Sequence, residues 1–389
     1  MNQGSTIFSQ IFSLVSKYEF DKCVRRYEGN CRVQKFTCWE QFLAMSFAQL
    51  TYRESLRDIE VCLNAVGSKL YHSGIRSRIA RSTLADANEK RNWRIYEDFG
   101  KLLIEEARAL YADDQEFSLN LKSMVYAFDS TTIDLCLKLF PWAKFRRRKG
   151  AVKMHTLLDV RGSIPIQVEV TTGAVHDVNM LDALAFEAGA FYILDRGYVD
   201  FDRLYHMEQA KAFFVTRAKD NFAFQRLYSK SVNKSKGVRC DQTVQLKGFY
   251  AARDYPAKLR RIKYYDTEDD RTLIFLTNNF ILSALTIAQL YEQRWKVELF
   301  FKWIKQHLRI KAFYGTSSNA VNTQIWIALC IYLLVCILKK KMKLEQPIYT
   351  ILQILSISLF EKIPVRHVFQ TYQNEKSNNK PCNQLILFE

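Results

Sequence analysis

The spacing of apolar and polar residues divides the chain into helical, strand-rich and again helical parts. Residues 1–118 carry apolar residues at helical spacing. Three pairs spaced as capping boxes predict helix starts in this part: Thr37 with Glu40, Ser55 with Asp58, and Thr83 with Asp86. The helix that begins at Thr83 is predicted to run without interruption to Tyr111. We therefore expect a helical domain over residues 1–118.

From Lys122 onward the pattern changes to short apolar runs typical of strands. Strands are predicted at residues 124–128, 151–160, 164–171, 191–194 and 212–216. Arg161-Gly-Ser reads as a hairpin turn, and helices are predicted at 180–188 and 204–209. This order fits a mixed α/β sheet with helices packed on it, and residues 119–216 are expected to form its first part.

The stretch 217–280 breaks this alternation, because polar loops separate short strand-like runs at residues 243–246, 262–265 and 273–277. It is interpreted as a β-rich insertion between the sheet and the helix that completes the sheet domain, at 281–320. A helical region, 321–389, is expected to follow. It includes most of a long apolar helix at 320–343 and ends in a polar tail from Asn374.

The chain is organised around a predicted helix that runs through Tyr291 to Arg309, entered by Thr286 and Gln289 as a capping box. At roughly 100° per residue, one stripe of about 80° collects a single acid among bases and a tyrosine. Its members are Tyr291, Arg294, Glu298, Lys302, Lys305 and Arg309. A charged stripe on a solvated helix is the ordinary alternative. However, the stripe adjoins the apolar face that must be buried, which suits a metal-binding carboxylate among groups that hold phosphates.

The net charge of the chain indicates a polyanionic partner. The chain of 389 residues has a formal charge of +17 and a pI near 9.4. Bases are spread over the whole length instead of gathering on one amphipathic helix, which favours nucleic acid over a membrane surface. Nearly half of the residues are apolar, so a folded protein with a substantial core is expected.

Cysteines and apolar runs indicate the compartment. The nine cysteines show no C-x-x-C spacing, which argues against a zinc site and a disulfide framework. The N-terminal residues lack the features of a secretory signal. The longest apolar run, 325–338, is short for a membrane span and fits a buried helix. A cytoplasmic protein that does not contact membrane is therefore expected.

Two aspartates, Asp129 and Asp195, each follow an apolar strand, and Glu298 lies on the helix after the insertion. Acids at strand ends face a crevice in α/β sheets. Three carboxylates meeting there would hold two Mg²⁺ ions, which suits in-line displacement at phosphorus. The alternative for each aspartate is an ordinary turn residue. Asp177, in a loop, has a weaker context.

These residues carry a resemblance to a known family. Asp129-Ser-Thr, Asp195-Arg-Gly-Tyr, and Tyr291-x2-Arg294-x3-Glu298-x6-Lys305 resemble the three signatures of DDE insertion-sequence transposases. The third has the Y-R-E-K spacing of the group named after insertion sequence four, and it matches at all four positions. The resemblance covers roughly residues 120–315. Lys153, His155, His176 and Asp177 also resemble residues of this group, without an assigned role.

The resemblance implies an RNase H-like catalytic domain, split by a β insertion before its last helix. It implies that Asp129, Asp195 and Glu298 bind the metal, Mg²⁺ with Mn²⁺ able to substitute. Tyr291, Arg294 and Lys305 correspond to positions that contact DNA phosphates. The implied partners are double-stranded DNA, as terminal inverted repeats and target DNA, and a second copy of the chain in a synaptic complex. A prokaryotic enzyme acting on chromosomal or plasmid DNA is implied.

Further bases are candidates for DNA contact. The densest cluster is Arg146, Arg147, Arg148 and Lys149, and Arg217, Lys219 and Lys302 are added because polynucleotide phosphates need several cations. Arg81 precedes the predicted helix from Thr83, where a basic loop suits phosphate contact. A solvated loop or surface helix is the alternative for 146–149 and for the region of Arg81.

Aromatic residues bear on one step of the reaction. In some relatives a tryptophan of the insertion stacks on a flipped base, but residues 217–280 contain none. Tyr250, Tyr255, Tyr264 or Tyr265 could stack instead. Trp295 and Trp303 are expected in the core, and His155 is expected to be structural.

The sequence thus predicts a transposase: a metal-dependent DNA nuclease and strand transferase with an N-terminal helical DNA-binding region. The alternatives are a DNA-binding protein without catalysis and an RNase H-like nuclease without strand transfer. A DNA-binding protein without catalysis has no need of three carboxylates within a basic site, because they would repel DNA. Their presence therefore favours an enzyme.

Overall fold

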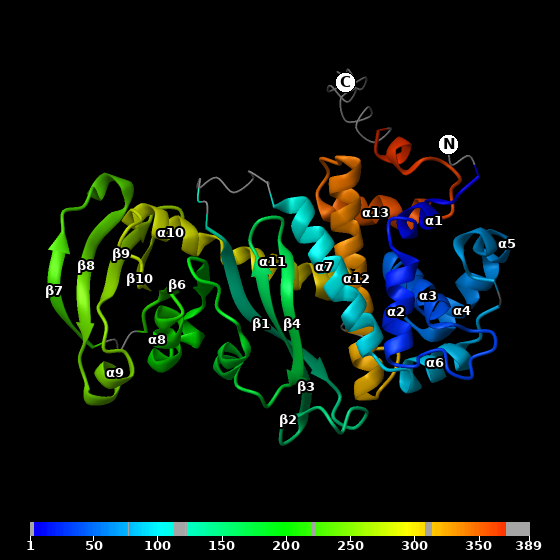
Figure 1. The fold of residues 1–389 in the computed structure, drawn as a ribbon, viewed down its shortest axis with the longest axis horizontal. Coiled ribbons are helices and arrows are strands. Elements are labelled where there is room, and N and C mark those ends of the chain that lie inside the picture. Colours follow the sequence, from blue (N-terminus) through cyan, green and yellow to red (C-terminus); the bar gives the residue numbers. More distant parts are fainter. Residues whose placement is uncertain are drawn as a thin grey trace, which may run out of the picture. The chain divides into compact units, whose positions relative to one another are not determined.

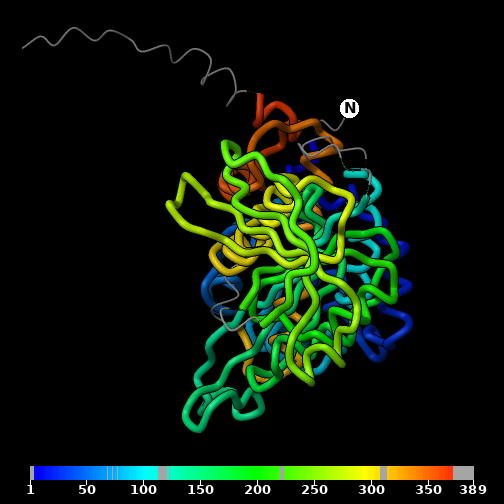
Figure 2. The backbone as a smooth tube through the Cα atoms, turned by 90° about the vertical axis from the view of Figure 1, so that its left-hand side faces the viewer, coloured from blue at the N-terminus to red at the C-terminus, as the bar shows by residue number. Residues whose placement is uncertain are grey.

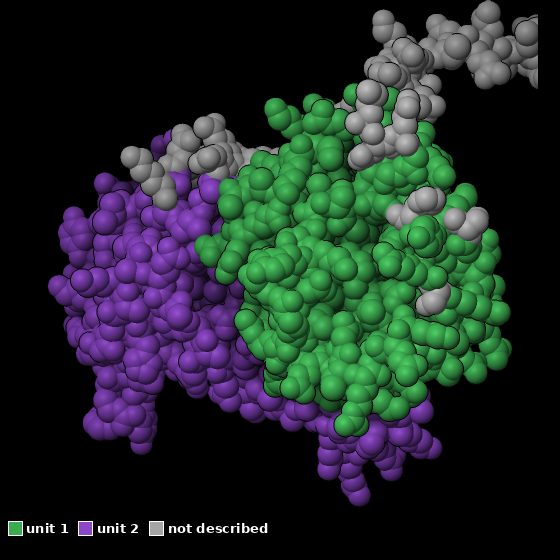
Figure 3. Space-filling view, turned by 45° about the vertical axis from the view of Figure 1, so that its right-hand side comes forward, with its two compact units in different colours: residues 1–110, 303–389 green, residues 111–302 purple. Residues whose placement is uncertain are grey.

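The computed structural model describes residues 4–76, 78–112, 121, 123–219, 223–307 and 313–370. The polar tail predicted from Asn374 and Arg309 of the predicted stripe lie outside these residues. The chain divides into two compact units, one of residues 1–110 and 303–389 and one of residues 111–302 (Figure 3). We refer to them as the helical unit and the sheet unit.

The helical unit consists of helices throughout its described part. Its longer elements are α1 (Ile7–Phe12), α2 (Lys17–Arg26), α3 (Cys38–Leu50), α4 (Leu56–Ala65), α5 (Gly67–Leu70), α6 (Arg81–Lys90), α7 (Arg94–Tyr111), α12 (Ser318–Met342) and α13 (Ile348–Ser358). The predicted capping box at the start of α3 is confirmed, because Thr37 and Glu40 bond each other's backbone amides. Ser55 likewise caps α4 as predicted.

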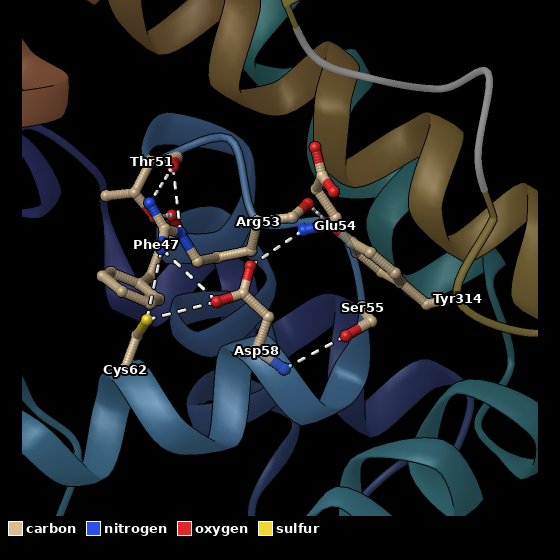
Figure 4. A network of polar contacts seen from close by, with 8 residues as sticks. All are labelled: Phe47, Thr51, Arg53, Glu54, Ser55, Asp58, Cys62 and Tyr314. Atoms are coloured by element: carbon tan, nitrogen blue, oxygen red, sulfur yellow. Dashed lines mark hydrogen bonds and ion pairs between the residues drawn. The ribbon is translucent and has the colours of Figure 1, made fainter.

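The turn between α3 and α4 is fixed by a polar network around Arg53 (Figure 4). The Arg53 guanidinium donates to the backbone oxygen of Thr51 at 2.6 Å and contacts the carboxylate of Asp58 at 3.4 Å. Tyr314 donates from its hydroxyl to the backbone oxygen of Arg53 at 2.6 Å. The network therefore ties residues near the start of α12 to a turn that lies about 260 residues earlier in the chain.

The single helix predicted from Thr83 to Tyr111 is wrong, because it is interrupted between α6 and α7. The side-chain amide of Asn319 donates to the backbone oxygens of Asn88 and Arg91 at 2.8 and 2.6 Å. Its side-chain oxygen accepts from the backbone N–H of Trp93 at 3.3 Å. A residue distant in sequence thus satisfies the backbone groups that the interruption exposes.

Helix α12 is the core element of the helical unit. It is long and apolar enough to cross a membrane by composition, yet the whole of its apolar window is buried inside the unit. Gly100 of α7 allows α7 and α12 to pack closely, since a Cβ at this position would meet the Trp326 ring of α12 at 3.0 Å. The prediction of a buried helix over the longest apolar run is confirmed.

The sheet unit is built on ten strands in its described part (Figure 1). They are β1 (Val125–Leu135), β2 (Lys144–Arg146), β3 (Lys149–Asp159), β4 (Ile164–Thr172), β5 (Phe191–Leu194), β6 (Phe213–Arg217), β7 (Phe224–Lys230), β8 (Val238–Leu246), β9 (Leu259–Asp266) and β10 (Arg271–Thr277). Their order is β2-β3-β1-β5-β6-β10-β9-β8-β7, with β4 paired to β3. Strands β5 and β6 are parallel to β1, whereas the other pairs are antiparallel. The expected mixed α/β sheet is confirmed.

The prediction that the first strand ends at Asp129 is wrong, because β1 continues to Leu135. Its first four residues are buried between β3 and β5. Pairing with β5 stops at Phe128, and beyond that residue only β3 accompanies β1. The apolar run of β1 therefore ends at Phe128 because its neighbour β5 ends there, although β1 itself continues.

The strands of the predicted insertion extend the same sheet. Strand β10 pairs with β6 and β9 pairs with β10, so the sheet continues outward through β8 to β7. In Figure 2 these strands lie side by side in light green and yellow, and the β2–β3 hairpin projects in teal. Strand β7 is largely exposed and its alternation is weak, which is why the sequence did not reveal it.

The helix predicted over 180–188 is wrong. A 3₁₀ helix, η2 (Asp177–Ala183), precedes an irregular stretch that leads to β5. Two further elements, η3 (Arg196–Tyr198) and α8 (Phe201–Gln209), connect β5 to β6, and α9 (Phe249–Asp254) lies between β8 and β9. Residues of β1, β5, β8 and α8 form one buried apolar cluster that includes Phe128, Leu194 and Leu204.

The predicted continuous helix through Tyr291 and Arg294 is also wrong. Two helices, α10 (Ala284–Glu292) and α11 (Trp295–His307), are separated at Gln293 and Arg294. The backbone there makes tighter i→i−3 bonds, such as that from Arg294 to Tyr291 at 3.0 Å. Ser283, rather than Thr286, caps α10, since its hydroxyl accepts from the Thr286 amide.

Candidate active site

Asp129 and Asp195 lie at the same level on neighbouring parallel strands. Phe128 of β1 is the register partner of Leu194 of β5, and each aspartate is the next residue. The Asp129 carboxylate accepts from the backbone N–H of Ser130 at 2.8 Å. Asp195 caps η3 by accepting from the Gly197 amide at 3.2 Å. Both aspartates therefore lie just beyond the last paired residues of β1 and β5.

Arg294 links the third acid to this pair. One guanidinium nitrogen stands 3.4 Å from the Asp129 carboxylate and the other 2.7 Å from that of Glu298. Glu298 lies one turn after Arg294 at the start of α11, and its side chain is half exposed. The i,i+4 relation that the sequence predicted for Arg294 and Glu298 is thus present, despite the interruption before α11.

The electrostatics of Asp129 reflect how closely the acids approach. The pKa of Asp129 is raised to about 6, chiefly by burial and in addition by the charges of Asp195 and Glu298. The Ser130 amide and the Arg294 guanidinium act in the opposite direction. The three carboxylates are therefore close enough to repel one another, and a bound cation would relieve that repulsion.

The donor set fits a hard divalent cation. Carboxylate oxygens are the ligands that Mg²⁺ prefers. As the side chains stand, no three His, Cys, Asp or Glu residues of the described ranges are grouped closely enough to hold an ion. Arg294 supplies the positive charge beside Asp129 and Glu298 instead. Metal binding by Asp129, Asp195 and Glu298 therefore stays a prediction from the sequence.

A concavity of about 420 Å³ is lined in part by Arg294, the residue that pairs with Asp129 and Glu298. Three residues predicted to bind DNA contribute to its wall: Arg217, Tyr291 and Arg294. Tyr291 is only 7% exposed and its ring stacks near Phe275, at 4.9 Å between centroids. The lining also includes acids of the β9–β10 turn, among them Asp266 and Glu268, which the sequence analysis treated only as a polar loop.

Trp295 also lines this concavity. Its exposure of 48% contradicts the prediction that it lies in the core. Trp303, further along α11, is buried as predicted.

The other predicted DNA-binding residues are dispersed. Arg146 to Lys149 form the exposed turn between β2 and β3 and do not line the concavity. Lys219 is exposed and donates to the backbone oxygen of Val199 at 2.8 Å. Lys302 is exposed on α11, and Lys305 follows on the same helix. Arg81 is exposed at the first position of α6, in the helical unit.

A second polar cluster lies beside Asp129, and sequence reasoning gave it no role. Asp177 accepts from the Ser130 hydroxyl at 2.7 Å and lies 3.2 Å from the Lys153 ammonium. His155, 2% exposed, makes a hydrogen bond with Thr171 at 2.9 Å. The expectation of a structural His155 agrees with this burial. The sequence shows Lys153 with His155 and His176 with Asp177 as two separate pairs. Only the tertiary structure brings Asp177 next to Lys153 and His155.

The family described as "Transposase DDE domain" matches residues 120–334, which is more than half of the chain. The chain therefore belongs to the DDE transposases, as the signatures predicted. It is a metal-dependent DNA nuclease and strand transferase that acts in DNA transposition. Residues 3–76 match a second family, described only as a domain of unknown function.

Relatives among known proteins carry the same description. The chain is 33% identical to a putative transposase y4zB of Sinorhizobium fredii, over 77% of its own length and 82% of that protein. It is 34% identical to a probable transposase for insertion sequence element IS5377 of Geobacillus stearothermophilus, over 56% and 57% of the two lengths. These similarities make it a DDE transposase of the insertion-sequence type.

A comparison with solved structures gives a piggyBac transposase synaptic complex with hairpin DNA. The match has a TM-score of 0.44 and 10% identity, and it covers 96% of this chain and 80% of that one.

Proposed function

We propose that this transposase cuts DNA at the ends of its own element and joins them to target DNA, with Asp129, Asp195 and Glu298 as its catalytic carboxylates. The observation that carries the proposal is the ion-paired link from Asp129 through Arg294 to Glu298, beside Asp195. These acids come from β1, the end of β5 and α11, so only the folded chain unites them.

The same three side chains are proposed as ligands for two Mg²⁺ ions, with Mn²⁺ able to substitute. Such ions activate water or a 3′-hydroxyl and stabilise the departing 3′ oxygen. The buried Asp129 carboxylate, with its raised pKa and two acidic neighbours, gains most from a cation. The Ser130 amide keeps one of its oxygens oriented through a hydrogen bond of 2.8 Å.

The bases beside the acids are proposed to hold the DNA backbone. Arg294 presents a rigid set of N–H donors that matches phosphate oxygens, and Arg217 contributes to the same concavity. Buried Tyr291 supports Arg294, whose guanidinium carbon lies 5.9 Å from its ring centroid. Lys302 and Lys305 extend these contacts along α11. The exposed turn of Arg146, Arg147, Arg148 and Lys149, together with Lys219, is proposed to contact phosphates further from the scissile bond.

The helical unit is proposed to bind the element ends through its own basic surface. Arg81 is exposed at the first turn of α6. A second concavity, of about 590 Å³, is lined by Lys17, Lys35 and Arg76. Three cations around one hollow suit contact with a phosphate backbone. Lys17 and Lys35 were not singled out from the sequence, because they lie far from the arginine-rich loop along the chain.

We further assign the sheet unit to the RNase H-like fold and the protein to the group named after insertion sequence four. The central order β4-β3-β1-β5-β6, with β5 and β6 parallel to β1, supports the first assignment. The Y-R-E-K spacing supports the second. The proposed working state is a homodimer that holds two terminal inverted repeats in a synaptic complex.

Use of a DNA hairpin would require an aromatic platform other than tryptophan. Of the tyrosines considered, Tyr255 is fully buried and bonds Glu208, so it cannot stack on a base. Tyr265 donates to Asp270 at 2.5 Å. Tyr264 lines the concavity beside Arg294, and Tyr250 is exposed on α9. Tyr250, Tyr264 and Tyr265 are the candidates that remain, because a hydrogen bond from a hydroxyl does not cover the face of a ring.

The test is to incubate the protein with Mg²⁺ and DNA that carries the ends of its own element. We expect cleavage at the ends and joining to target DNA. Glu298→Gln should reduce both to background, because an amide is a poor ligand for Mg²⁺, while DNA binding stays equal or improves as a repelling charge is lost. Glu105→Gln, at an exposed position of α7, is the matched control and should behave as the unchanged protein.

Three outcomes separate the alternatives. Joined products establish the transposase activity that we propose. End nicking without joining would indicate a nuclease, and retardation on a gel without cleavage would indicate a DNA-binding protein. Full activity of the Glu298→Gln variant would refute the assignment of the carboxylates.

A further inference from the structure

The cluster around Asp177 lies immediately behind the proposed metal ligand Asp129. Successive side chains of a strand point to opposite faces, so Ser130 projects away from the face on which Asp129 meets Arg294. The Ser130 hydroxyl donates to the Asp177 carboxylate at 2.7 Å. His155 is the register partner of Ser130 on β3, and its Nδ1 lies 3.7 Å from the same carboxylate.

Lys153 holds Asp177 in place. Its ammonium group lies 3.2 Å from one carboxylate oxygen and 3.3 Å from the other, and it donates to the backbone oxygen of Val175 at 2.8 Å. Lys153 is only 8% exposed, so its charge depends on Asp177 for compensation. The first residue of η2 is thereby fixed to β3, with one carboxylate oxygen shared between the ammonium and the Ser130 hydroxyl.

Ser130 transmits this constraint to Asp129. Its hydroxyl is bound to Asp177, and its backbone N–H donates to the Asp129 carboxylate at 2.8 Å. A change in the position of the Ser130 backbone would alter the direction of that N–H. The orientation of the Asp129 carboxylate therefore depends on a charged pair that does not touch it.

We propose that the Lys153–Asp177 pair is a positioning device that orients Asp129 for metal binding through Ser130. The inference rests on the proposed role of Asp129 as a ligand. Groups behind a metal ligand typically change metal affinity by roughly 10–100-fold when they are removed. A pair that only stabilised the fold would leave metal affinity unchanged in a folded variant.

The experiment compares Ser130→Ala with Ser130→Thr in the full-length protein. Ala removes the hydroxyl that bonds Asp177, whereas Thr retains it at a strand position that favours β-branched residues. Mn²⁺ binding is measured by the electron paramagnetic resonance signal of the free ion, which does not depend on activity. We expect the Ala variant to bind Mn²⁺ about tenfold more weakly, and the Thr variant to bind close to the unchanged protein.

Asp129→Asn serves as the reference, since it removes the proposed ligand itself. If it weakens Mn²⁺ binding and Ser130→Ala does not, the positioning role is refuted while the proposed function stands. A Thr variant as weak as the Ala variant would also refute the positioning role. If Asp129→Asn binds Mn²⁺ as the unchanged protein does, the proposed function fails, and the inference with it.

Asp177→Asn distinguishes positioning from a direct role in the reaction. Asn keeps an acceptor for the Ser130 hydroxyl but leaves the buried Lys153 charge without its counterion. Positioning predicts weaker Mn²⁺ binding and an end-cleavage rate that returns toward the unchanged value at saturating Mg²⁺. A rate that stays low at every Mg²⁺ concentration, with normal Mn²⁺ affinity, would show that Asp177 acts on the reacting atoms and would overturn the proposal.

Discussion

At the scale of single residues, the site is governed by how burial and charge act on a few side chains. Burial and two acidic neighbours raise the pKa of Asp129 to about 6, while Arg294 and the Ser130 amide favour its charged form. His155, a short distance away, is also pushed toward its neutral form by burial. The region around the acids thus contains titratable groups whose charge state depends on the fold.

His155 makes the protein less stable in acid. Burial lowers its pKa from 6.5 to about 4; Asp177 raises it and Lys153 lowers it, and Glu169 is its register partner on β4. Between these values the unfolded chain binds more protons than the folded one, so stability falls as the pH decreases through this range. The loss amounts to about 3 kcal/mol when the pH is lowered from 7 to 4.

Urea unfolding of the metal-free protein at several pH values checks this expectation. His155→Gln removes this titrating group, so the variant should lose about 3 kcal/mol less stability than the unchanged protein when the pH is lowered from 7 to 4. The raised pKa of Asp129 acts in the opposite direction in both proteins and cancels in the comparison. His206→Gln, at an exposed position of α8, is the control and should keep the original profile. Equal pH profiles for all three proteins would contradict the expected effect of burial.

At the scale of elements, contacts between segments that are distant in sequence decide where helices stop. Asn319 of α12 satisfies backbone groups on both sides of the break between α6 and α7. In the sheet unit, tighter backbone bonds separate α10 from α11 and still leave Arg294 one turn before Glu298. Both breaks occur in stretches without proline or glycine, so no local signal marks them.

Replacing Asn319 with alanine should destabilise the helical unit. Three backbone groups would lose a partner, at a cost of about 2–3 kcal/mol in the free energy of unfolding. Asn322→Ala on the same helix is the comparison, because its side chain bonds Ser318 one turn earlier. Chemical denaturation measures both variants. A smaller loss for Asn319→Ala than for Asn322→Ala would contradict the capping role.

At the scale of the whole molecule, the charge of +17 makes DNA binding an electrostatic process. Each phosphate neutralised by a base releases counterions, so affinity decreases with salt in proportion to the number of contacts. The exposed arginines at the β2–β3 turn offer three adjacent charges for this purpose. Acids of the β9–β10 turn, by contrast, line the concavity beside Arg217 and Arg294 and would repel a phosphate backbone there.

The triple change Arg146→Gln, Arg147→Gln and Arg148→Gln should weaken DNA binding uniformly across sequences. If each arginine contacts one phosphate, the slope of log affinity against log salt becomes shallower by about 3. Binding titrations over a range of salt concentrations give that slope. The paired change Lys362→Gln and Arg366→Gln, at exposed positions of the helical unit, is the control for the loss of charge alone. Equal slopes in the triple variant and the control would exclude phosphate contacts at the turn.

Sequence reasoning was most successful where local chemistry decides the structure. The strands at 151–160, 164–171 and 191–194 alternate or are fully apolar, and the structure places β3, β4 and β5 there within a residue or two. The capping box of Thr37 and Glu40 needs only residues three apart. The acids could be singled out because Asp195 directly follows a buried strand and because the spacing from Arg294 to Glu298 is one helical turn.

The sequence by itself therefore determined the family and predicted the three acids as its site, because these depend on residue types and short spacings. Only the tertiary structure decided that β1 continues past Asp129, that Trp295 is exposed and that Asp177 supports Ser130. Each of these depends on which segment becomes a neighbour, as with the end of β5 and the loop that returns to β3. Such contacts join residues tens to hundreds of positions apart, and their energy has no counterpart in local sequence.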